Sequence, residues 1–208
     1  PTREPAFGLE AVWIEPSQRD QARTLGYTVV DAATAISTHL NKVLRENASD
    51  MLSHDETQQL LDKLAAKSPK IVEDLVPGKL SLGILTRTLQ NLLAESVSIR
   101  DMRTIAEALT EASTRTQDPE QLTAMVRPKL GRMIMQSLID GDNGLQVMTL
   151  EPSLEQLLHN VLQQSQPGQA VVLEPGLSEN LFAGLREGAR TVEDMGHPAV
   201  LVVSPVIR

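Results

Sequence analysis

The stretch EPAFGLEAVWIEPSQRDQARTLGYTVVDAATAISTHL, residues 4–40, sets the expected fold of the amino-terminal part of the chain. Its apolar run at residues 7–14 is closed by Pro16, which is typical of a short, half-buried strand. Residues 19–25 are good helix formers, and Gly26 follows them where a helix often needs a left-handed residue. The first half of the stretch therefore predicts a strand and then a short helix.

The second half of this stretch predicts another strand and a longer helix. Residues 27–30 are aromatic and β-branched, which favours a strand. Asp31 is placed to accept the free backbone N–H groups of a helix over residues 32–48. Apolar residues recur in that helix at three- and four-residue spacings, so one face should pack against the strands. Strand, helix, strand and helix together predict a compact α/β unit.

Helix-start patterns follow one another through the middle of the chain. They are Ser53 with Glu56, Ser81, Ser98 with Asp101, and Asp118 before Pro119. Each precedes a run with apolar residues at helical spacing. Pro128 lies inside the last of these helices and predicts a kink or a restart there. The middle of the chain is therefore expected to be all-helical.

The last third of the chain predicts a second mixed unit. Residues 141–144 have turn chemistry, and residues 145–150 alternate as a strand should. Helices are expected to begin near Ser153 and Ser178, and residues 199–203 are typical of a buried strand. The final residues begin an element that is not completed, so we expect this domain to be truncated.

Composition excludes several classes of protein. The chain has no cysteine, which excludes disulfides, thiolate metal sites and cysteine nucleophiles. A formal net charge of −8 disfavours a nucleic-acid-binding module. No window approaches the roughly 20 apolar residues of a membrane helix, so we expect no membrane segment in this fragment. Hydrophobic residues make up 41% and aromatic residues 2%, which favours helical cores of Leu, Val, Ile and Ala.

A search for catalytic residues gives no candidate. The four histidines lie far apart in sequence, and none has a second ligand at metal spacing. Nucleophile elbows and glycine-rich phosphate loops are missing from the sequence. Asp55 with Glu56, and Glu73 with Asp74, are more typical of helix starts than of acid–base pairs. We therefore expect a protein that is not an enzyme and that has no cofactor and no metal site.

Several ungapped segments resemble one protein family. They are EPAFGLEAVWI (4–14), GYTVVD (26–31), ATAISTHL (33–40), LVPGKLSLGILTRTLQNLLAE (75–95) and IRDMRTIAEAL (99–109). This wording resembles the cytoplasmic part of the export gate family of flagella and injectisomes, and it is more similar to the flagellar branch. The alternatives are the injectisome branch and a helical interaction module unrelated to flagella.

The resemblance implies an α+β, helix-rich multidomain fold. It has a small α/β unit, a central all-helical domain and a carboxy-terminal α/β domain. The implied parts are the second subdomain in residues 1–31, a return segment of the first subdomain in 32–51, a helical subdomain in 52–131 and an incomplete α/β subdomain in 132–208. The whole protein would be an inner-membrane protein with this part on its cytoplasmic face.

The resemblance also implies a binding surface and partners. In the family, a groove between the first two domains takes export chaperones that carry late flagellar substrates. The matching residues here are Glu4, Phe7 and Thr38, and Leu9 and Val30 would extend the surface. Further implied partners are other export-apparatus proteins, including the ATPase complex, and eight more copies of the protein in a nonameric ring. Nucleic acid is not among them.

From the residues alone, the same positions have a simpler interpretation. Phe7 would be a core residue of its strand, Glu4 a surface charge before Pro5, and Thr38 a helix hydroxyl bonded back to a carbonyl. The two interpretations differ most clearly at Phe7. A docking surface needs its ring exposed, whereas a core needs it buried.

Overall fold

The structure is a computed structural model that describes residues 1–139, 144–164 and 173–208. The chain divides into two compact units, Pro1–Leu130 and Gly131–Arg208. Helices dominate both units and the described strands are short, which confirms the helix-rich α+β fold. The finer division into residues 1–31, 32–51, 52–131 and 132–208 stays a prediction.

The first unit opens with a small hairpin. Strand β1 (Thr2–Arg3) pairs antiparallel with β2 (Glu10–Ala11). The predicted strand over residues 7–14 is therefore wrong in extent, because the partner strand offers only two residues for the ladder. The predicted strand over residues 27–30 is also wrong, since these residues are irregular in the structure.

The predicted short helix is confirmed. A 3₁₀ turn, η1 (Pro16–Gln18), leads into α1 (Arg19–Thr24). Gly26 follows with a φ of +87°, the left-handed conformation expected after a helix. Of the predicted strand–helix–strand–helix unit, the structure therefore contains the first strand, as part of a short hairpin, and both helices, but not the second strand.

Helix α2 (Ala32–Glu46) begins where the sequence predicts. The Asp31 carboxylate accepts a hydrogen bond of 2.7 Å from the Thr34 N–H group. The expected burial of its apolar face is wrong, however, because Ile36 is 67% exposed and Leu40 55%. The short hairpin cannot cover a helix of 15 residues, so most of this face meets solvent.

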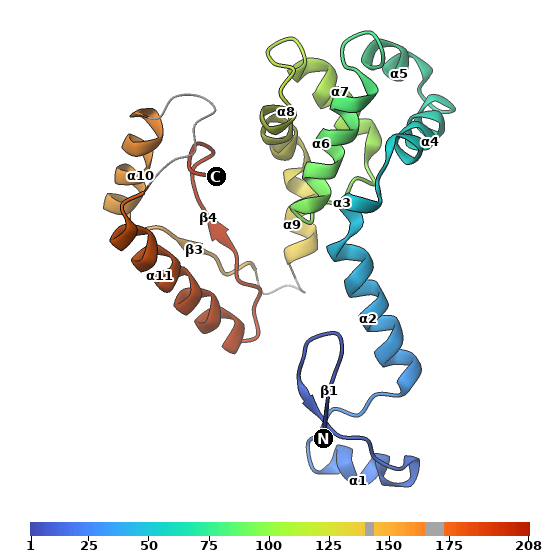
Figure 1. The fold of residues 1–208 in the computed structure, drawn as a ribbon, viewed down its shortest axis with the longest axis vertical. Coiled ribbons are helices and arrows are strands. Elements are labelled where there is room, and N and C mark those ends of the chain that lie inside the picture. The colour runs from blue at the N-terminus through green and yellow to red at the C-terminus, as the bar shows by residue number, and fades with distance from the viewer. Residues whose placement is uncertain (140–143, 165–172) are drawn as a thin grey trace. The chain divides into compact units, whose positions relative to one another are not determined.

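The rest of the first unit is a cluster of helices (Figure 1). They are α3 (Ala48–Met51), α4 (His54–Ala65), α5 (Pro69–Leu75), α6 (Leu82–Ala94), α7 (Met102–Ala112), α8 (Pro119–Val126) and the 3₁₀ turn η2 (Arg127–Leu130). The predicted caps of α4, α6 and α8 are confirmed. In α7 the cap is Asp101, which accepts from Thr104, and not Ser98. Pro128 lies in η2, where the predicted helix restarts.

Helix α6 is the centre of this cluster. It packs against α3, α4 and α8. Leu85, Leu89 and Leu92 are fully buried on it, as the leucine spacing of the sequence predicts. The hydroxyls of Thr57 and Thr86 lie 3.1 Å apart between α4 and α6, and each also donates to a carbonyl of its own helix. Buried polar atoms are thus satisfied inside an apolar core.

The second unit contains α9 (Gly131–Leu138), α10 (Pro152–Gln164) and α11 (Pro175–Asp194). Strand β3 (Met148–Thr149) pairs in parallel with β4 (Leu201–Val202), so both predicted strands form, over two residues each. Helices α10 and α11 begin at prolines, one and three residues before the predicted serines. Most of the predicted turn at residues 141–144 lies outside the described residues.

Candidate functional site

The turn at residues 4–9, called here the Phe7 turn, is shaped by Glu4. One carboxylate oxygen of Glu4 accepts the Ala6 N–H group at 2.8 Å, and the other accepts the Phe7 N–H group at 2.7 Å. The main chain closes the same turn, because Gly8 N–H donates to the Glu4 carbonyl at 2.9 Å. Gly8 has a φ of +71°, which favours glycine at this position. The turn is therefore held in one shape by its own residues.

A long-range contact joins the Phe7 turn to α2. The Lys42 ammonium donates a hydrogen bond of 2.5 Å to the Ala6 carbonyl, 36 positions away in sequence. It also lies 5.7 Å from the centre of the Phe7 ring, within the range of a cation–π interaction. Glu46, one helical turn further on, forms an ion pair of 3.6 Å with Lys42. The turn and the helix thus meet at Lys42.

Three of the five predicted site residues are exposed, and Glu4 and Thr38 are half-buried. The side chain of Phe7 is 67% exposed, so the interpretation of this ring as a core residue is wrong. Leu9 and Val30 are also exposed, and Thr38 is half-buried. Ala6, the residue before Phe7, is nearly fully buried. This arrangement presents an aromatic side chain to solvent.

The structure brings together some of these residues more closely than others. Glu4 and Phe7 share the turn, and Leu9 continues it through its carbonyl, which accepts the Glu4 N–H group at 2.8 Å. Thr38 lies one helical turn before Lys42 on the same face of α2. Val30 lies just before the cap of α2, and no hydrogen bond among residues 1–139 joins it to the turn. Binding by these residues stays a prediction.

Sequence reasoning missed Lys42. A helical spacing of four residues after Thr38 places it on the same face, and this spacing was visible in the sequence. Its contact with Ala6, however, depends on how the turn folds back against α2. Such a contact between distant residues is not encoded in any local pattern.

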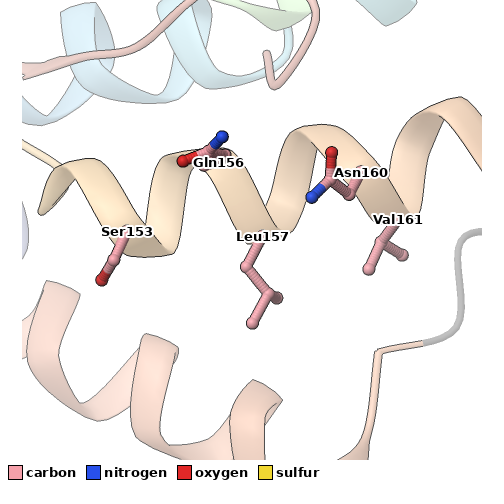
Figure 2. Close-up of a pocket in the computed structure, with 5 residues that line it drawn as sticks. All are labelled: Ser153, Gln156, Leu157, Asn160 and Val161. Atoms are coloured by element: carbon pink, nitrogen blue, oxygen red, sulfur yellow. The ribbon is translucent and has the colours of Figure 1, made fainter.

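A shallow hollow lies in the second unit, along α10. Figure 2 shows its lining, which consists of Ser153, Gln156, Leu157, Asn160 and Val161, all on one helix. These side chains include no acid, base or strong nucleophile. The hollow contains none of the predicted site residues, so it does not add to the site on the first unit.

The shifted pKa values belong to helix starts and not to the Phe7 turn. Hydrogen bonds from Thr34 lower the pKa of Asp31, and the Ser53 hydroxyl lowers the pKa of Glu56. The Ser153 hydroxyl likewise lowers the pKa of Glu151 before α10. Perturbed groups of this kind often mark reactive sites, but here each is explained by capping a helix.

The described residues contain no candidate metal cluster and no candidate membrane-spanning helix. No group of three His, Cys, Asp or Glu side chains among them is arranged to hold a metal ion. Within the same residues, no helix has the length and hydrophobicity that crossing a bilayer requires.

Comparison with known proteins gives a consistent family. The model of the FHIPEP family matches residues 1–208. The flagellar biosynthesis protein FlhA of Yersinia enterocolitica is 47% identical over 207 residues, covering 100% of this chain and 29% of that protein. The chain spans less than a third of the length of the curated relatives it matches.

Solved structures share the fold. Chlamydia pneumoniae CdsV aligns with a TM-score of 0.80 at 20% identity, covering 100% of this chain and 66% of that one. Nonameric EPEC SctV-C aligns with a TM-score of 0.72 at 26% identity, covering 93% and 65%. The family model and the 47% identity together show that the chain belongs to the FHIPEP family of flagellar and type III secretion export proteins.

Proposed function

We propose that this chain is a docking platform of a flagellar protein export gate. It binds complexes of export chaperones with their substrates and passes the substrates to a channel in the inner membrane. The observation that carries the proposal is the exposed ring of Phe7 on a turn fixed to α2. The family membership supplies the setting, and the higher identity to flagellar relatives favours the flagellar branch.

The geometry suits a reversible protein contact. Aromatic side chains are frequent anchors of protein interfaces, because they bury a large area when a partner covers them. The Phe7 turn is already shaped by Glu4 and Gly8, so little ordering is needed on binding. Leu9 in the turn and Val30 before α2 are exposed and would add apolar area, and Thr38 would add a hydroxyl on α2.

We also propose that the protein acts by binding and without catalysis. The pKa shifts support this, because each of them arises at a helix cap and not in a pocket with converging polar groups. Energy for export would come from the proton motive force and from a separate ATPase complex, itself a partner. Turnover of a substrate by the purified protein would contradict this proposal.

A homo-oligomeric ring completes the proposal. The EPEC relative is described as nonameric, and its fold matches 93% of this chain. We infer that the whole protein assembles in the same way, so that each copy in the ring carries one Phe7 turn. Repetition would raise the local density of docking sites and favour rebinding.

Substitution of Phe7 tests the proposal. In the full-length protein, Phe7→Ala should weaken binding of a purified flagellar chaperone–substrate complex by at least about tenfold, because a central aromatic anchor is lost. Thr38→Met should also weaken it, by placing a larger side chain at the edge of the surface. Isothermal titration measures the affinities, and circular dichroism checks the fold.

Phe182→Ala is the matched control. Phe182 is the chain's other phenylalanine and is 56% exposed on α11. Its replacement removes a side chain of the same type from a different surface and should leave the affinity unchanged. Equal affinities for Phe7→Ala, Phe182→Ala and the unaltered protein would show that the Phe7 turn is not the docking surface.

A further inference from the structure

We propose that Lys42 is a positioning residue of the docking surface. It holds the Phe7 turn on α2 and keeps the exposed ring beside its own ammonium group. The proposal rests on the docking function proposed above and adds a residue that the family resemblance did not supply. Three contacts of one ammonium group carry it.

The first contact anchors the turn. The hydrogen bonds of Glu4 and Gly8 shape the turn, but they join residues within it. They do not determine where the turn lies along α2. The bond from Lys42 to the Ala6 carbonyl is the hydrogen bond that fixes this place within residues 1–139. A bond from a charged donor is stronger than a neutral one, and Ala6 is nearly fully buried beside it.

The second contact orients the ring. The Lys42 ammonium lies 5.7 Å from the ring centre. The cation–π attraction therefore favours ring orientations in which one face of Phe7 is turned toward the ammonium. The ring nevertheless remains 67% exposed, which leaves area for a partner. Lys42 therefore restricts the direction of the ring without covering it. A restricted ring loses less entropy when it is bound.

The third contact restrains Lys42 itself. Glu46 lies four residues later on α2 and forms an ion pair of 3.6 Å with the ammonium. Thr38, Lys42 and Glu46 follow one another at helical spacing, so they form one line along α2. The line begins at Thr38, at the predicted edge of the docking surface, and ends at Glu46, which restrains Lys42. Its middle member is the one that touches Phe7.

Fluorine NMR tests the positioning without any partner. The chain has two phenylalanines, so 4-fluorophenylalanine labelling gives two resonances, and Phe182→Leu assigns them. Lys42→Met keeps an aliphatic side chain but removes the charge and the donor. It should shift the Phe7 resonance by more than its linewidth and leave the Phe182 resonance in place. Lys42→Arg keeps charge and donor and should stay near the original spectrum.

Titration of the full-length protein with a purified flagellar chaperone–substrate complex tests the consequence. Lys42→Met should weaken binding about tenfold, from loss of one charged hydrogen bond and one cation–π contact. Lys42→Arg should bind within about threefold of the original protein. Lys63→Met, at an exposed lysine on α4, is the control and should bind as before.

The outcomes separate the two proposals. If the unaltered protein and Phe7→Ala bind the complex equally, the Phe7 turn is not the docking surface, and the fluorine spectra alone still decide whether Lys42 holds the turn. If Phe7→Ala weakens binding but Lys42→Met does not, the positioning role is overturned. An unmoved Phe7 resonance in Lys42→Met overturns it as well, as does a loss of affinity that Lys42→Arg fails to restore.

Discussion

Both carboxylate oxygens of Glu4 accept backbone N–H groups inside the Phe7 turn, so this side chain is engaged before any partner arrives. Its role at the docking surface is then to set the shape of the turn. A charge at the rim of an interface mainly affects the rate of association. A residue that shapes the turn affects instead how long a partner stays bound.

We predict that Glu4→Ala loosens the turn. Amide hydrogen exchange of Ala6 and Phe7 should become about three- to tenfold faster, because both N–H groups lose their acceptor. NMR of the purified chain measures the two rates. Glu10→Ala, at an exposed acid on β2, should leave them unchanged. Unaltered exchange in Glu4→Ala would mean that the main-chain bonds of the turn suffice.

The site residues were predictable to different degrees. Glu4, Phe7 and Thr38 were named from the family resemblance, whereas residue patterns alone favoured burial of Phe7. In the structure Phe7 lies in the turn between β1 and β2, outside either strand, and its ring is exposed. Lys42 was not predicted, since its role depends on a contact across 36 positions.

Among the elements, helix starts were the most predictable. Asp31, Ser53, Ser81 and Asp118 each accept a backbone N–H group two or three residues ahead. Such a bond joins residues two or three positions apart, so the residue types that form it can be recognised in a short stretch of sequence. Strands were less predictable, because a strand needs a partner that no local pattern reveals. Residues 27–30 are β-branched and aromatic, yet they form no strand in the structure.

The caps predict how stability depends on pH. The Ser53 hydroxyl lowers the pKa of Glu56 in the folded state below its usual 4.5. A lowered carboxyl pKa contributes stability that is present above the unfolded value and is lost as the pH falls through the folded value. Glu56→Gln should therefore melt about 2–4 °C lower than the original chain near about pH 6, with the gap narrowing toward about pH 3.

Thermal melts followed by circular dichroism across this range make the comparison. Glu73→Gln, at an exposed acid on α5, provides the control and should follow the original chain. A gap that stays constant from neutral to acidic pH would show that the capping box of α4 does not stabilise the fold through the charge of Glu56.

At the scale of the whole molecule, burial is distributed unevenly. Residues 52–130 enclose a core with many fully buried side chains, among them Leu61, Leu89, Ile105 and Leu122. Within residues 1–51, all of which the structure describes, Ala6 is the only buried residue. The hydrophobic content of the sequence is similar along the chain, so composition predicted the core but not this asymmetry.

The exposed apolar residues of the first 51 positions have a calorimetric consequence. Trp13 is 80% exposed and Tyr27 69%, so melting this segment brings little new apolar surface into water. Chains of 208 residues ordinarily unfold with a heat-capacity increase of about 2.5–3.1 kcal/mol/K. Scanning calorimetry of dilute samples should give a smaller increase; a value inside that interval would show that self-association buries the segment. The heat-capacity increase on melting should thus correspond to a chain of fewer than 208 residues.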